Sequence, residues 1–113
     1  MSIQDKIREQ VTSNRVVLYM KGTPQMPQCG FSATVVEIMK RCGVTDYQAV
    51  DVLQDPEIRQ GIKEFGNWPT IPQLYVKGEL VGGADIVRSM VTSGEMHGLL
   101  GVPAPDRTPP DIS

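Results

Sequence analysis

The sequence predicts an α/β fold in which a four-stranded mixed sheet is flanked by helices, with an extra helix at the N-terminus. Two observations lead to this class. Stretches whose apolar residues recur at helical spacing alternate with short apolar runs bounded by turn residues, in the order α-β-α-β-α-β-β-α. Two strands joined through a helix and then followed by a hairpin give a sheet with strands in both directions.

The chain opens with a predicted helix and a predicted buried strand. Ser2 and Asp5 have the spacing of a capping box, which marks a helix start. The helix that follows carries an apolar face with a residue at every fourth position: Ile3, Ile7 and Val11. Residues 15–20 then form a largely apolar run without alternation, which predicts a strand buried on both of its faces.

A loop rich in glycine and proline, residues 22–28, separates this strand from the next helix. The helical pattern resumes over residues 30–41, and Gly43 is a typical stop signal. Four apolar residues are expected on one side of this helix: Phe31, Val35, Ile38 and Met39.

The second half of the chain supplies the remaining elements. Residues 47–52 predict a short strand, and Asp55-Pro56-Glu57 combines a capping acid with proline at the first helical position. Gly66 ends that helix. Residues 73–76 and 79–81 flank a two-residue turn and predict a β-hairpin.

The C-terminal part predicts one more helical region and then a tail. The helical pattern covers residues 85–100 and is expected to break at Gly94. Residues 102–113 hold four prolines and no periodic pattern, so this segment is predicted to be disordered. We therefore expect one domain over residues 1–101. A βαβ unit followed by a ββα unit is the arrangement of the thioredoxin fold.

Composition excludes several classes of function. The formal net charge is −2 without any run of Lys or Arg, which argues against nucleic acid as the main partner. No stretch has the roughly 20 apolar residues that a membrane helix needs. The first residues lack the basic start and apolar core of a secretory signal. A cytoplasmic location is the expectation.

The two cysteines must be explained separately. Cys29 and Cys42 would lie 13 residues apart on one helix, roughly 20 Å along its axis, which is too far for a disulfide. Cys29 stands where a loop meets a helix N-terminus, and the helix dipole there favours a thiolate, with Lys21 as a second positive influence. The alternative for Cys29 is an inert buried cysteine.

Cys42 and His97 receive no functional role. Cys42 lies at the other end of the helix, where the dipole disfavours a thiolate, so a small packed residue is the better interpretation. His97 is a lone histidine in the last helical region, and no sequence neighbour makes it a ligand or a base.

Two further segments could bind an extended ligand. Trp68-Pro69-Thr70-Ile71-Pro72 precedes a strand and suggests a cis peptide bond before Pro72, which would free the peptide groups of Ile71 for pairing. Trp68 taken alone is more typical of a core or rim position. Gly82-Gly83-Ala84-Asp85 opens a helix whose N-terminus suits a carboxylate, although a Gly-Gly pair is weak evidence by itself.

Taken together, these motifs resemble the signature set of the monothiol, or CGFS-type, glutaredoxins. The resemblance covers residues 1 to about 100 and is specific in combination and spacing. It is carried by Lys21, Cys29-Gly30-Phe31-Ser32, Trp68-Pro69-Thr70-Ile71-Pro72-Gln73 and Gly82-Gly83-Ala84-Asp85.

The resemblance implies binding of glutathione and of a [2Fe–2S] cluster that Cys29 ligates. It implies that the glycyl carboxylate of glutathione meets positive side chains, that the cysteinyl part pairs with the segment before the strand, and that the γ-glutamyl end meets the last helix. The residues so implied are Lys21 and Arg59, then Thr70, Ile71 and Pro72, then Gly83, Ala84 and Asp85. Many relatives have cysteine where this chain has Ala84, so no second thiol is available there.

Two functions follow as hypotheses. The first is an iron–sulfur carrier in cluster storage, transfer and iron homeostasis. Four thiolate ligands would come from Cys29 of two chains and from two glutathione molecules, so the cluster form would be a homodimer. The resemblance adds BolA-family proteins and client apoproteins as partners. The second hypothesis is a glutathione-dependent thiol–disulfide oxidoreductase. Ser32 stands where a dithiol enzyme has its resolving cysteine, and residues 22–28 look like an insertion relative to those enzymes, which ranks this hypothesis second.

Overall fold

A computed structural model gives the fold and describes residues 2–101. The tail predicted over residues 102–113 lies outside the described residues. The element order confirms the predicted succession, with a short 3-10 helix added after the second strand. None of the helices in residues 2–101 combines the length and apolarity needed to cross a membrane.

The sheet has four strands in the order β2-β1-β3-β4. β1 is parallel to β2, whereas β1 with β3 and β3 with β4 are antiparallel pairs. In the central register, Leu18 of β1 lies opposite Ala49 of β2 and Leu74 of β3. The strands are β1 Val16–Met20, β2 Gln48–Asp51, β3 Gln73–Val76 and β4 Glu79–Gly82.

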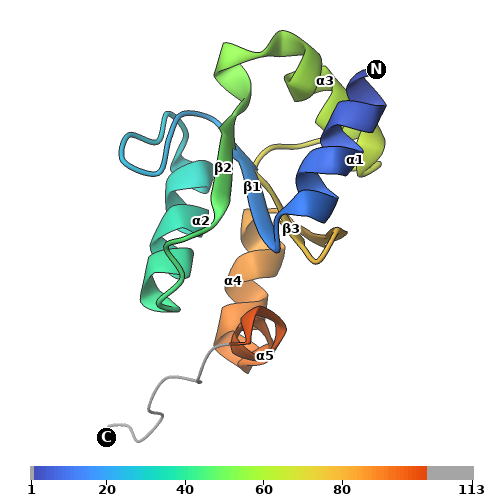
Figure 1. The fold of residues 1–113 in the computed structure, drawn as a ribbon. Coiled ribbons are helices and arrows are strands. Elements are labelled where there is room, and N and C mark those ends of the chain that lie inside the picture. Colours follow the sequence, from blue (N-terminus) through green and yellow to red (C-terminus); the bar gives the residue numbers. More distant parts are fainter. Residues whose placement is uncertain (1, 102–113) are drawn as a thin grey trace, which may run out of the picture.

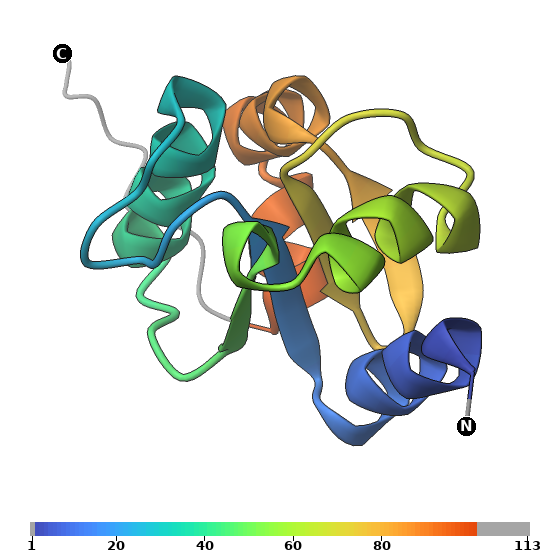
Figure 2. The ribbon, with the colours of Figure 1, turned by 90° about the horizontal axis from the view of Figure 1, so that it is seen from above.

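Helices cover both faces of this sheet, so the molecule has three layers (Figure 2). One face carries α1 (Ile3–Ser13) and α3 (Pro56–Phe65). The other face carries α2 (Gly30–Arg41), α4 (Ala84–Ser93) and α5 (Glu95–Leu100). Side chains of β1 alternate between the two cores and all five are buried, which confirms the prediction of a strand covered on both faces.

The predicted helix signals act as expected. Ser2 and Asp5 form both hydrogen bonds of the capping box, and the Asp55 carboxylate accepts from the backbone N–H groups of Glu57 and Ile58. The break predicted at Gly94 is present: this residue has φ +87°, a conformation that suits glycine, and it separates α4 from α5.

Two expectations were wrong in detail. The strand predicted over residues 47–52 ends at Asp51, because the Asp51 carboxylate accepts from the Leu53 N–H at 2.9 Å and turns the chain into the 3-10 helix η1 (Val52–Gln54). Phe31 was expected on the packed side of its helix but is 60% exposed. The buried face of α2 begins instead at Ser32, the next residue in the same turn, and continues through Val35 and Met39.

Candidate functional site

Cys29 is the N-cap residue of α2, so its sulfur lies beside the free N–H groups of the first helical turn. The pKa of the Cys29 thiol is lowered below its usual value, chiefly by the backbone N–H of Ser32. Partial burial acts against this shift, whereas the Phe31 N–H, the nearby Lys21 charge and the Ser32 hydroxyl add to it. The side chain is half-buried and therefore reachable. The predicted thiolate position is thus supported by its surroundings.

Ser32 holds this end of the site together. Its Oγ is buried and accepts from the Lys21 backbone N–H at 3.1 Å, which ties the end of β1 to the first turn of α2. Because that contact uses Oγ as an acceptor, its hydrogen remains free to donate to the Cys29 sulfur. The sequence indicates Ser32 only as the residue in the place of a second thiol and gives no signal for this structural role.

A pocket of about 490 Å³ opens beside Cys29. One wall is the segment before β3, in which the Ile71–Pro72 peptide bond is cis, as predicted. The other is the start of α4, where a Cβ on Gly83 would come within 3.3 Å of the Pro72 carbonyl oxygen and of Trp68 Nε1. The pocket is lined by Lys21, Cys29, Phe31, Lys63, Trp68, Pro69, Thr70, Ile71, Pro72, Gly83, Ala84, Asp85 and Ile86.

The structure brings together all the predicted site residues except Arg59. Arg59 is exposed on α3 and is absent from the pocket lining, whereas Lys63, one turn further along the same helix, lines it. Residues four apart share a helix face, and Lys63 follows Arg59 by four residues. This spacing is the sequence signal that could have predicted Lys63 as a pocket residue. Phe31, Trp68 and Ile86 also line the pocket, and only Trp68 had been considered as a rim residue.

The loop between β1 and α2 is held at both of its ends. It projects outward beside the N-terminus of α2 (Figure 1). Gly22 donates to the Asp51 carboxylate at 2.9 Å, and Gln28 donates to the Lys21 carbonyl oxygen at 2.9 Å. Gly22 and Pro27 pair across the loop as an antiparallel bridge. The loop therefore closes on itself before the chain reaches Cys29.

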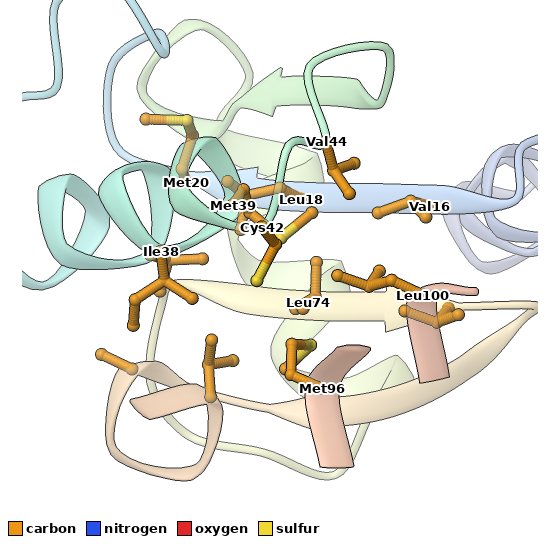
Figure 3. Close-up of a cluster of buried hydrophobic side chains, with 14 residues drawn as sticks. Val16, Leu18, Met20, Ile38, Met39, Cys42, Val44, Leu74, Met96 and Leu100 are labelled. Atoms are coloured by element: carbon orange, nitrogen blue, oxygen red, sulfur yellow. The ribbon is translucent and has the colours of Figure 1, made fainter. Parts of the chain in front are cut away.

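Cys42 lies in the core, at the opposite end of α2 from Cys29. Figure 3 shows its sulfur among apolar side chains, near Met39 and Leu18. Burial raises the pKa of the Cys42 thiol. His97 is buried too, and among the described residues its Nδ1 has no hydrogen-bond partner. Neither side chain is part of the pocket lining.

The donor set of the site is one accessible thiol. No group of three or more His, Cys, Asp or Glu side chains in residues 2–101 is placed to hold a metal ion. A metal centre on Cys29 would therefore need ligands from beyond residues 2–101 of this chain. An extended anionic ligand, in contrast, would find lysine side chains, free peptide groups and a helix N-terminus around one pocket.

Comparison with known proteins gives consistent relatives. Residues 16–81 match the family model described as Glutaredoxin. The chain is 54% identical over 97 residues to an uncharacterised monothiol glutaredoxin of Synechocystis sp., covering 86% of this chain and 90% of that one. It is 50% identical over 100 residues to glutaredoxin 4 of Haemophilus ducreyi, covering 88% and 92% of the two chains.

Solved structures of glutaredoxins are similar to this chain as well. Reduced poplar apo GrxS14 is similar with 44% sequence identity and a TM-score of 0.76, covering 88% of this chain and 90% of that chain. A buckwheat glutaredoxin–glutathione complex has a TM-score of 0.77 at 22% identity, covering 88% and 87% of the two chains, and shares the fold.

Proposed function

Because this chain belongs to the monothiol glutaredoxins, we propose that it binds glutathione and holds a [2Fe–2S] cluster between two subunits. The cluster is cargo, to be stored or passed to other proteins in iron homeostasis. The single observation that carries the proposal is Cys29: one accessible thiol of lowered pKa, beside a pocket that contains no further metal-ligating set among the described residues.

The ligand count leads from this observation to a shared cluster. A [2Fe–2S] cluster is held by four ligands, usually thiolates. Each chain contributes Cys29, because Cys42 is buried at the far end of the helix. Two chains then supply two thiolates, and two glutathione thiols complete the set. Since two of the four ligands are small molecules that exchange, the cluster is labile, which suits transfer better than electron transport.

The pocket offers suitable groups for each part of glutathione. The glycyl carboxylate would lie near the ammonium groups of Lys21 and Lys63, with Arg59 one turn before Lys63 on the same helix. The cysteinyl part would pair with the peptide groups of Ile71, beside Thr70 and Pro72. The γ-glutamyl end would meet the N-terminus of α4, at Gly83, Ala84 and Asp85. A protein of this fold has been solved as a glutathione complex.

We also propose which proteins bind near the pocket and where in the cell this protein acts. Two exposed apolar side chains lie at the rim of the pocket with Cys29, namely Phe31 and Ile86. They are available for contacts with another protein. BolA-family proteins and client apoproteins are the partners that we propose, in the cytoplasm.

Anaerobic reconstitution with iron, sulfide and glutathione tests this function. We expect visible absorbance of a [2Fe–2S] cluster only when glutathione is present. An equally stable cluster formed without any small thiol would contradict the borrowed-ligand model. Absence of any cluster with glutathione present would contradict the function itself.

A second candidate is supported by the reachable Cys29 thiolate. That thiolate could attack the glutathione sulfur of a protein–glutathione mixed disulfide, forming a Cys29–glutathione disulfide and releasing the protein thiolate. Free glutathione would then attack this disulfide, giving oxidised glutathione and restoring Cys29. Assay of deglutathionylation with free glutathione tests it, and we expect low rates because the loop of residues 22–28 restrains the site.

A further inference from the structure

A buried polar pair lies directly behind the pocket wall. Gln73, the first residue of β3, is fully buried, and its side-chain Nε2 donates to the carbonyl oxygens of Trp68 at 3.0 Å and Thr70 at 3.2 Å. Its Oε1 accepts from the Tyr75 hydroxyl at 2.9 Å. Carbonyl oxygens can only accept, so this arrangement fixes which end of the amide faces the wall. Tyr75 must then be the donor.

The two hydrogen bonds from Gln73 set the direction of the peptide group between Thr70 and Ile71, which faces the pocket. The Thr70 carbonyl and the Ile71 N–H belong to one planar peptide unit, which is trans. The two groups therefore point in opposite directions. With the Thr70 oxygen held inward by Gln73, the Ile71 N–H is aimed outward. Among the described residues, this N–H takes part in none of the turn, loop and cap hydrogen bonds.

The surroundings keep the Tyr75 hydroxyl in place. Its ring packs edge-on against Tyr19 with centroids 5.7 Å apart and lies 5.9 Å from the Phe65 ring. Burial raises the pKa of Tyr75 to about 12, so the hydroxyl stays protonated at neutral pH. A Cβ at Gly66 would overlap this hydroxyl and come within 3.0 Å of Gln73 Oε1. The end of α3 thus leaves room for the pair.

We propose that Gln73 and Tyr75 are positioning residues for glutathione binding: Gln73 holds the Trp68 and Thr70 carbonyls inward, and Tyr75 holds the Gln73 side chain, so that the Ile71 peptide faces the ligand. Neither residue touches the ligand. The inference rests on the proposed function, since it assigns the ligand to this wall. It gives Gln73 a task that an apolar core residue cannot perform.

The test compares Tyr75→Phe with Tyr19→Phe. Both variants lose one buried hydroxyl on the same side of the sheet, but the Tyr19 hydroxyl donates to Gln10 Oε1 at 2.7 Å, away from the wall. Glutathione is titrated into the reduced protein, followed by amide NMR signals. We expect Tyr75→Phe to weaken binding by about three- to tenfold, the worth of about one hydrogen bond. The Thr70 and Ile71 amide signals should also shift before any ligand is added, whereas Tyr19→Phe should change neither readout.

Gln73→Met removes the hydrogen bonds to both carbonyl oxygens while keeping the side-chain length. It should therefore reduce the affinity for glutathione more than Tyr75→Phe does. Parent-like binding and unchanged Thr70 and Ile71 signals in Tyr75→Phe would overturn the positioning role, as would an equal loss in Tyr19→Phe. A parent protein that binds no glutathione would instead overturn the proposed function, and this role with it.

Discussion

Cys29 and Cys42 occupy the two ends of one helix, and their environments push their pKa values in opposite directions. The Ser32 N–H favours the thiolate of Cys29, so this thiol should lose its proton at a lower pH than an ordinary cysteine, for which the pKa is about 8.5. Burial disfavours the thiolate of Cys42, so its deprotonation moves to higher pH.

We therefore predict that Cys29 is alkylated faster than Cys42 throughout the range from neutral to alkaline pH. Iodoacetamide labelling of the Cys42→Ser and Cys29→Ser variants, followed by mass spectrometry against pH, measures each thiol alone. The labelling midpoint of Cys29 should fall below that of a free cysteine. A midpoint for Cys29 above that of free cysteine would show that the first turn of α2 does not stabilise the thiolate.

The same pair of variants separates the roles of the two thiols in cluster binding. Cys29→Ser should abolish cluster assembly, because it removes the accessible thiolate of each chain. Cys42→Ser should leave assembly intact, at most lowering stability slightly through a polar group in the core. Visible absorbance after reconstitution is the measurement. Loss of the cluster in a folded Cys42→Ser protein would refute this assignment.

At the scale of single residues, chemistry was easier to predict than side-chain direction. Cys29 and Lys21 could be placed because a helix start and a strand end are local features. The choice between Arg59 and Lys63 depends on how far α3 extends along the pocket, which is a matter of tertiary packing. The sequence pattern put Phe31 on the wrong side because the buried face of α2 begins at Ser32, one residue further along.

Among the elements, α1 is held by a narrow apolar contact with α3. Ile7 is fully buried, and Gly61 of α3 leaves the space that Ile7 and Ile3 occupy: a Cβ there would lie 3.1 Å from each side chain. Gln4 adds a hydrogen bond to the Gly61 carbonyl oxygen at 3.0 Å. The extra N-terminal helix is therefore an integral layer of the domain.

We predict that Ile7→Ala lowers the free energy of unfolding by about 2–5 kcal/mol, the usual cost of a cavity at a fully buried position. Urea denaturation measures it. Ile3→Ala, at a half-buried position on the same helix face, is the matched control and should cost less. Equal and negligible effects of both substitutions would mean that α1 does not pack on α3.

The loop between β1 and α2 is the second element with a consequence for function. We predict that Ser32→Cys alone does not produce dithiol-like activity in glutathione-dependent disulfide reduction. Ser32 Oγ accepts from the Lys21 N–H, and a thiol is a weaker acceptor, so the substitution also loosens the site. The loop of residues 22–28 remains in place.

Shortening the loop is the complementary variant. Gly22 and Pro27 already lie side by side, so removal of residues 23–26 leaves only a short gap to close between them. If the loop restrains the site, this variant gains disulfide reductase activity even with Ser32 present. Full activity from Ser32→Cys in the unshortened protein would show that the missing thiol is the only obstacle.

The order of elements was predictable because most of their limits are set locally. Ser2, Asp55 and Gly94 begin or end helices through their own hydrogen bonds or backbone angles. The end of β2 was not predictable in the same way, since it depends on the Asp51 side chain, which also binds the Gly22 N–H from a distant loop. Likewise, a buried Gln73 gives no sequence signal for the two carbonyls that it holds.

For the whole molecule, the pocket touches both cores of the sheet, because Ala84 belongs to one core, Ile71 belongs to the other, and both line the pocket. Each face has its own apolar core, and the pocket lies where the start of α2, the segment before β3 and the start of α4 meet. In the proposed cluster form, assembly would be governed by mass action on glutathione and on the second chain.

From this follows a prediction about ligand removal. The cluster-loaded protein should run as a dimer carrying two glutathione molecules, and complete removal of free glutathione should dissociate it to monomers with loss of visible absorbance, because two of the four ligands then leave by mass action. Size-exclusion chromatography with multi-angle light scattering, with and without glutathione in the buffer, measures both changes together. Cys42→Ser should behave like the parent, since Cys42 is buried away from the pocket. A dimer that keeps its cluster after exhaustive removal of glutathione would require two further ligands from each pair of chains. Residues 2–101 place no second accessible thiol near Cys29 to supply them.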